Sequence, residues 1–189
     1  MDDSKIIDLF WQRSENAIQE TDVKYGKLCM HLARNILSNN EDVEECVNDT
    51  YLGAWNAIPP AKPNALCAFI AKITRNLALK KFEFNTAQKR NPEVMISLTE
   101  LEDCLSGSEN AEDLYDAKAL ASHISTFLRK QDQLSRKVFI RRYWFYDSIC
   151  EIATQLSMSE SKVKTMLFRT RSKLKNYLVE TDYMKSIDK

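Results

Sequence analysis

Hydrophobic and polar positions alternate at helical spacing along most of the chain, most clearly within residues 147–178. Two apolar stripes are separated there by a turn of about three residues, as in a helix-turn-helix. The first stripe is Ile149, Ile152, Ala153 and Leu156, and the second is Val163, Leu167, Thr170 and Leu174. Ser159, between the stripes, is a suitable N-cap for the second helix. The pattern predicts two helices joined by a short turn, each with one buried face.

Similar stripes predict further helices before this pair. In the first half of the chain we expect a short helix within residues 1–20 and longer helices over 23–37, 42–57 and 65 to about 82. Three prolines between residues 59 and 63 separate the last two. In the second half, stripes over 114–130 and from 134 onward predict two helices that pack with the helix-turn-helix.

Residues 91–113 interrupt this regularity. They contain seven acidic residues and no lysine or arginine, and they show no sustained period. Such a segment is typical of a flexible linker. The predicted fold class is therefore all-α, with two small helical domains (1–90 and 114–180) joined by an acidic flexible linker (91–113). The second domain ends in the helix-turn-helix, and residues 181–189 form a tail.

Composition agrees with a helical protein and limits its environment. Only three glycines and four prolines occur in 189 residues, of which 44% are hydrophobic and 29% charged. No apolar run approaches the ~20 residues of a membrane span, and the N-terminus lacks the order of a signal peptide. The five cysteines are scattered without a C-x-x-C pair, which favours reduced thiols over disulfides or a metal site. We expect a cytoplasmic protein without membrane insertion, metal or cofactor.

Charge is sorted by sign along the chain. Residues 129–178 contain twelve lysines and arginines against four acids, within a chain of net charge zero. Phosphate is the usual reason for such sorting, so this segment is predicted to bind nucleic acid. The alternative is an ordinary amphipathic helix pair with a solvated basic face.

The order and spacing of three stretches match a known pattern: DVEECVNDTYLGAW (42–55), AFIAKITRNLAL (68–79) and SICEIATQLSMSESKVKTMLFRTRSKL (148–174). Together they resemble the extracytoplasmic-function sigma factors of bacterial RNA polymerase. In that family the first stretch docks on the clamp helices of the polymerase's largest subunit. The second faces the promoter element nearest the start site, and the third reads the distal element. Ser157 stands where the family usually has a turn glycine.

This resemblance implies roles for individual side chains. The polymerase-binding side chains would be Glu45, Asn48, Asp49 and Leu52. Lys62 and Asn64 would cradle an extruded base, while Arg75, Asn76, Lys80 and Lys81 would hold backbone phosphates. In the second domain Lys164, Thr165, Phe168 and Arg169 would read the groove, and Arg171 and Lys173 would also contact DNA.

The resemblance also implies partners: core RNA polymerase, promoter DNA and an anti-sigma factor. The alternative function is a free-standing helix-turn-helix repressor or activator whose first domain senses a ligand or dimerises. An enzyme is disfavoured because the sequence has no glycine-rich phosphate loop and only two histidines, so we predict no catalytic residues.

Overall fold

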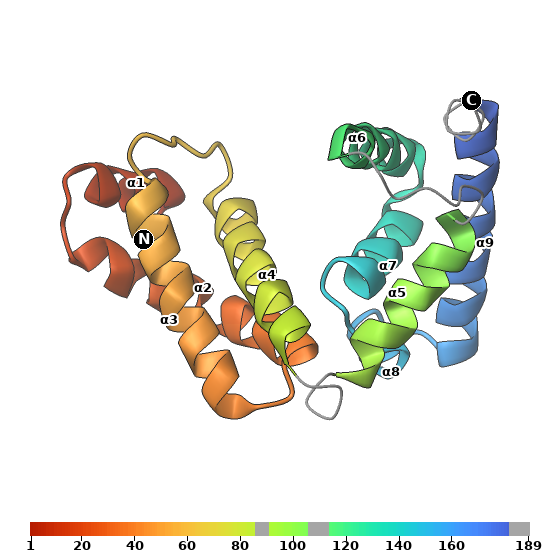
Figure 1. Cartoon of the computed structure of the whole chain (residues 1–189), viewed down its shortest axis with the longest axis horizontal. Helices are drawn as coiled ribbons and strands as arrows, with labels where there is room; N and C mark the ends of the chain where they lie inside the picture. Colours follow the sequence, from red (N-terminus) through yellow and green to blue (C-terminus); the bar gives the residue numbers. More distant parts are fainter. Residues whose placement is uncertain (86–90, 106–113, 182–189) are drawn as a thin grey trace. The chain divides into compact units, whose positions relative to one another are not determined.

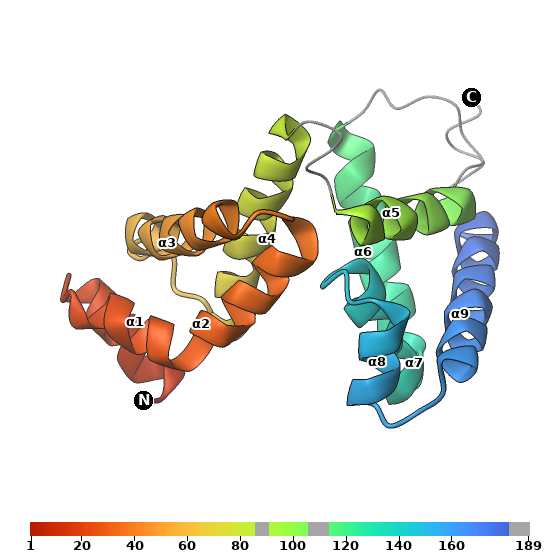
Figure 2. The same ribbon diagram turned by 90° about the horizontal axis from the view of Figure 1, so that it is seen from below.

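The computed structural model describes residues 1–85, 91–105 and 114–181, and within these ranges it contains nine helices. The chain divides into two compact units, Met1–Val94 and Met95–Lys189. We call them unit 1 and unit 2; Figures 1 and 2 show the helices of each. Two helical units confirm the predicted fold class. None of the described helices combines the length and the apolar composition that crossing a bilayer requires.

Unit 1 contains four helices whose core lies between the last three. They are α1 (Asp3–Trp11), α2 (Asn16–Ile36), α3 (Asn40–Ala57) and α4 (Leu66–Phe84). Helices α2, α3 and α4 pack against one another in pairs, and α1 covers α2. Phe10, Leu32, Val43 and Ile70 are among the side chains buried between them. Helices α2 and α3 thereby both pack against α4.

Helix α2 begins earlier than its hydrophobic stripe predicts. The sequence places its start near residue 23, whereas the structure starts it at Asn16. Ala17 and Thr21 are fully buried in this first part, and Thr21 Oγ1 donates to the Ala17 carbonyl at 2.7 Å. The buried surface of this part of α2 therefore consists of an alanine and a threonine whose hydroxyl bonds to its own helix. Large aliphatic side chains, which would mark a stripe, are not used there.

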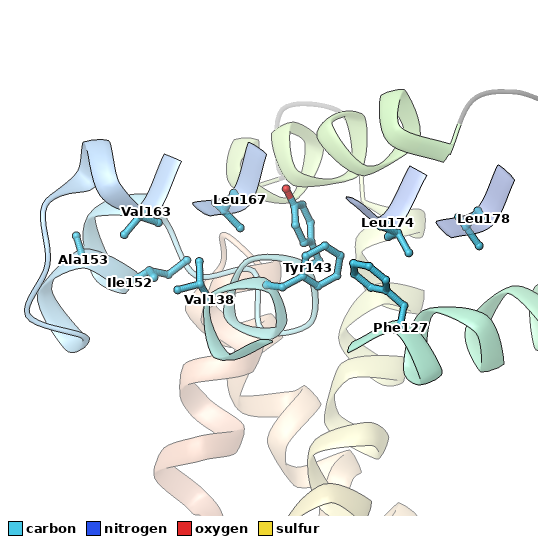
Figure 3. Close-up of a cluster of buried hydrophobic side chains, with 10 residues drawn as sticks. Phe127, Val138, Tyr143, Ile152, Ala153, Val163, Leu167, Leu174 and Leu178 are labelled. Atoms are coloured by element: carbon cyan, nitrogen blue, oxygen red, sulfur yellow. The ribbon is translucent and has the colours of Figure 1, made fainter. Parts of the chain in front are cut away.

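Unit 2 is built around its last helix. It includes α6 (Leu114–Lys130), α7 (Gln133–Tyr143), α8 (Ile149–Gln155) and α9 (Glu160–Glu180). Helix α9 packs against each of the other three. Figure 3 shows Ile152 and Ala153 near Val163 at one end of this core and Phe127 near Leu174 at the other. The predicted second stripe is buried, so the two-helix prediction for 147–178 is confirmed.

A further helix, α5 (Pro92–Leu105), occupies most of the predicted linker. The prediction of an irregular segment is therefore corrected for residues 92–105, while 106–113 and the predicted tail after Thr181 lie outside the described residues. The Asn91 side chain accepts from the Glu93 amide at 3.0 Å, directly ahead of the helix. From Met95 onward α5 belongs to unit 2, where Leu101 packs against the core.

Candidate nucleic-acid interface

The start of α8 is fixed by a capping box. The Glu151 amide donates to Ser148 Oγ at 3.2 Å, and the Ser148 amide donates to Glu151 Oε2 at 2.8 Å. Two amides that would lack a helical partner are satisfied in this way. The S-x-x-E signal was present in the sequence but was not used in our prediction. The cap aligns α8, which supports the next helix.

The turn between α8 and α9 is tight and has one unusual backbone angle. Ser157 adopts φ 52°, in the left-handed region that favours glycine. The Met158 amide donates to the Ala153 carbonyl at 2.9 Å and ties the turn to α8. Ser159 is the N-cap of α9, since its Oγ accepts from the Lys162 amide at 3.3 Å, so the predicted cap is confirmed. These bonds set the angle at which α9 leaves the turn.

Helix α9 presents one exposed polar face. Its buried side chains are Val163, Leu167, Thr170, Leu174 and Leu178. The predicted groove-reading side chains are all exposed on the other side: Lys164, Thr165, Phe168 and Arg169. Phe168 is 64% exposed, although it is one of the largest apolar side chains of the unit. An aromatic ring surrounded by cations on an outward helix face fits contact with a base, because phenylalanine packs on the thymine methyl group.

Arg171 and Lys173 differ in their surroundings. Lys173 is exposed, as a phosphate-binding side chain should be. Arg171 is only 23% exposed and binds the Glu100 carboxylate and the Tyr143 hydroxyl. Sequence reasoning missed both partners, because Glu100 counted only as one acid of the predicted linker and Tyr143 belongs to a different predicted helix, the one from 134 onward. The structure therefore separates Arg171 from the predicted readers.

In unit 1 the predicted DNA-binding residues are distributed along α4 and the loop before it. Lys62 and Asn64 are exposed in that loop, Asn76 and Lys80 are exposed on the helix, and Arg75 is half-buried there. The helix separates the loop from Lys80 by about 20 Å, at 1.5 Å per residue. These side chains consequently define an extended strip rather than one pocket.

Lys81, at the end of this strip, is engaged within the unit. Its Nζ forms ion pairs with the carboxylates of Asp42, at 3.1 Å, and Glu45. Burial opposes the charge on the amine, but the hydrogen bonds with Glu45 and Asp42 and the negative charges of both carboxylates together outweigh it and raise the pKa of Lys81. One predicted DNA contact is thus brought together with one predicted polymerase contact.

The four predicted polymerase-binding side chains lie together on α3. All are exposed, and their i, i+3, i+4, i+7 spacing places them on one face: Glu45, Asn48, Asp49 and Leu52. Leu52 is 56% exposed and borders an open hollow that Trp55 also lines, between α3 and the first turns of α2. An exposed leucine beside carboxylates is a surface that fits a partner with both apolar and basic groups.

Neither unit offers an evident metal site in the described part of the chain. No three His, Cys, Asp or Glu side chains come together there in a way that could hold an ion. The predicted site residues are those of a binding surface: exposed cations, amides and single apolar groups on helix faces.

Two family models match the sequence. Residues 23–87 match the model for Sigma-70 region 2, and residues 132–174 match the model for Sigma-70 region 4. Together the matches span more than half of the chain, and they contain every predicted site residue. No curated protein matches the chain as a relative. A solved structure of CnrH in complex with the cytosolic domain of CnrY is 21% identical, covering 95% of this chain and 98% of that chain with a TM-score of 0.43.

Proposed function

We propose that the chain, which belongs to the sigma-70 family, is a sigma factor of the extracytoplasmic-function group and that its two units divide the work of promoter recognition. In this proposal unit 1 binds RNA polymerase through α3 and the promoter element nearest the start site through α4. Unit 2 reads the distal element through α9. The family directs RNA polymerase to promoters and initiates transcription, and it is not a family of enzymes.

The observation that carries the proposal is the exposed face of α9. A helix presented by a helix-turn-helix enters the major groove with its N-terminal half against base edges. Lys164, Thr165 and Phe168 lie within the first nine residues of α9, and all three are exposed. Arg169 follows directly, and Lys173 lies one turn later, where phosphates replace bases. The side chains suited to base contacts, which carry hydrogen-bond donors or an apolar ring, thus precede Lys173, which is suited to the DNA backbone.

For α4 we propose contacts with the strand that is unpaired at the start site. Lys62 and Asn64, in the loop before α4, would hold an extruded base, and Arg75, Asn76 and Lys80 would bind the backbone of the same strand. Their extended arrangement supports this role, because a single strand requires a track of contacts rather than one deep pocket. Opening of the duplex would be stabilised by the base held in the loop.

For α3 we propose that Glu45, Asn48, Asp49 and Leu52 bind the clamp helices of the largest polymerase subunit. Asp49 supports this most directly. Carboxylates in a first turn stabilise their own helix, but Asp49 lies well beyond the first turn of α3, so that explanation does not apply to it.

The proposal includes the cellular location of the chain and its regulation by an inhibitor. The chain would act in the cytoplasm, where polymerase and chromosome meet, without a cofactor, and it would be held inactive by an anti-sigma factor. The extracytoplasmic-function group to which the motifs are similar usually has such a partner. Co-purification of a stable inhibitor with the tagged chain, released when transcription is induced, would support this part.

Run-off transcription tests the central proposal. Core polymerase and the purified chain are combined on a promoter library, and we expect transcripts that depend on the chain. The alternative, a free-standing repressor, predicts no polymerase binding and tight binding of the chain alone to an inverted repeat. The region 2 match over residues 23–87 favours the sigma factor, because a repressor has no need for that domain.

A further inference from the structure

Three side chains of unit 2 converge on the carboxylate of Glu100 in α5. Arg142 donates from Nη2 to Oε1 at 3.2 Å and from Nε to Oε2 at 3.4 Å. Arg171 donates from Nη1 to Oε2 at 3.1 Å. The Tyr143 hydroxyl donates to Oε2 at 2.9 Å and accepts from Arg171 Nη1 at 2.6 Å. Two guanidinium groups and one hydroxyl therefore surround a single carboxylate.

This set of donors also suits a phosphate. Guanidinium groups bind carboxylate and phosphate oxygens in the same paired geometry. Arg142 is held in position, since it is 1% exposed and its Nη1 also donates to the Asp147 carbonyl at 3.2 Å. Tyr143 is 7% exposed and packs in the core of the unit. Two of the three donors are thus preorganised, which is what an anion-binding site needs.

The network opens to solvent beside the proposed DNA-binding face. Glu100 is 24% exposed and Arg171 is 23% exposed, so one edge of the network is accessible. Lys175, four residues after Arg171, lies on the same side of α9 and is exposed. The two cations lie along one flank of the helix, and Glu100 neutralises Arg171. A DNA backbone that follows this flank passes the network.

We propose that Arg142, Tyr143 and Arg171 form an anion site, that Glu100 fills it in the free chain, and that a DNA phosphodiester group replaces Glu100 when α9 enters the groove. The proposal rests on the proposed function, because it takes α9 as the DNA-binding helix. Its consequence is that α5 competes with DNA. Binding to duplex then requires Glu100 to leave, which lowers the affinity of the free chain for every sequence alike.

Full-length Glu100→Gln tests the competition. We expect this variant to bind a fluorescently labelled duplex roughly 1.4- to fivefold more tightly than the wild type at low salt, the range of a partly exposed ion pair. Glu180→Gln is the matched control, since it removes the same charge from the exposed last turn of α9. In an Arg171→Ala background the gain from Glu100→Gln should fall sharply, because the two residues act through one contact. Equal affinity of Glu100→Gln and Glu180→Gln would overturn the proposal.

Hydrogen exchange on the wild-type chain provides a second test that no variant's folding can obscure. When duplex DNA is added, we expect amides of residues 95–101 in α5 to lose protection while those of α9 gain it. If α5 keeps its protection, Glu100 stays in contact with the two arginines when DNA binds, its role is structural, and the anion site is refuted. Arg169→Ala separates this result from the proposed function. Loss of duplex binding in that variant, together with unchanged α5 protection in the DNA-bound wild type, rejects only the anion site, whereas unchanged duplex binding by the variant rejects α9 as the DNA-binding helix.

Discussion

The amine of Lys81 in α4 is ion-paired with the carboxylate of Glu45 in α3. The family resemblance implies a DNA contact for Lys81 and a polymerase contact for Glu45. Asp42 provides a second carboxylate, 3.1 Å from Lys81 Nζ. A lysine that is held by two carboxylates must give up these contacts before it binds a phosphate. Its contribution to DNA affinity is consequently smaller than that of a lysine without such partners, and its contribution to the packing of α3 on α4 is larger.

We therefore expect Lys80→Ala and Lys81→Ala to have opposite profiles. Lys80→Ala should lower the affinity of the polymerase complex for all promoters alike and reduce the salt slope by about one. Lys81→Ala should change affinity less, but lower the free energy of unfolding by about 1 kcal/mol or less, because Glu45 is 65% exposed and water screens the pair. Salt-dependent binding and urea unfolding measure the two effects. A larger loss of DNA affinity in Lys81→Ala than in Lys80→Ala would contradict the expectation.

Reversing one charge on α3 tests the polymerase-binding face. Asp49→Lys should weaken binding to core polymerase at least tenfold, because the new lysine would face a basic group of the partner and like charges across an interface cost several kcal/mol. Glu44→Lys makes the same charge change on the same helix, and Glu44 is exposed outside the predicted set. Circular dichroism shows whether both variants remain helical. Equal polymerase binding by the two folded variants would reject the assigned face.

The sequence predicted those helices whose buried side chains are large and aliphatic. Helices α3, α6, α7 and the α8–α9 pair were placed within a few residues, since Val43, Leu167 or Leu174 mark their stripes plainly. The first turns of α2 were missed because Ala17 and Thr21 provide the buried surface there. Propensity and spacing therefore predict a helix best when its buried face consists of large aliphatic side chains.

Helix α5 was missed for a related reason. Ser97 is 1% exposed at a position where a stripe would show an aliphatic residue, and the surrounding acids resemble those of a disordered segment. The contact between Glu100 and Arg171 joins residues 71 positions apart, so no local pattern reveals it. By contrast, the exposure of the predicted groove-reading side chains of α9 could be predicted, because they lie opposite the buried apolar stripe of that helix. Arg171 lies at the edge of that stripe, where a helical wheel does not determine whether a side chain faces solvent or contacts a neighbouring helix.

The turn of the helix-turn-helix provides a stability prediction. Ser157 has φ 52°, and a side chain in this region costs about 1 kcal/mol that glycine avoids. Ser157→Gly should raise the free energy of unfolding by roughly 0.5–1 kcal/mol. Ser172→Gly is the control, since the same change in the exposed middle of α9 should destabilise by a similar amount. Thermal unfolding measures both; a lower midpoint for Ser157→Gly would show that the turn gains more from serine than from relief of strain.

The last prediction concerns the change from base contacts to phosphate contacts along α9. Arg169 is exposed next to Phe168, and Lys173 is exposed one turn later, about 6 Å further along the axis. A bidentate arginine contact with guanine is worth about 1–3 kcal/mol of discrimination, whereas a phosphate contact weakens all sequences evenly.

We therefore expect Arg169→Ala to reduce transcription from cognate promoters and to relax the preference at one or two positions of the distal element. Lys173→Ala should lower affinity evenly and reduce the salt slope by about one, because a single phosphate contact is lost. Binding and run-off transcription on a library randomised in the distal element measure both profiles. The two variants are matched in being exposed cations of one helix, so a shared loss of charge cannot explain a difference between them. If Lys173→Ala alters the preferred sequence while Arg169→Ala does not, α9 enters the groove with its C-terminal half, and the assigned orientation is reversed.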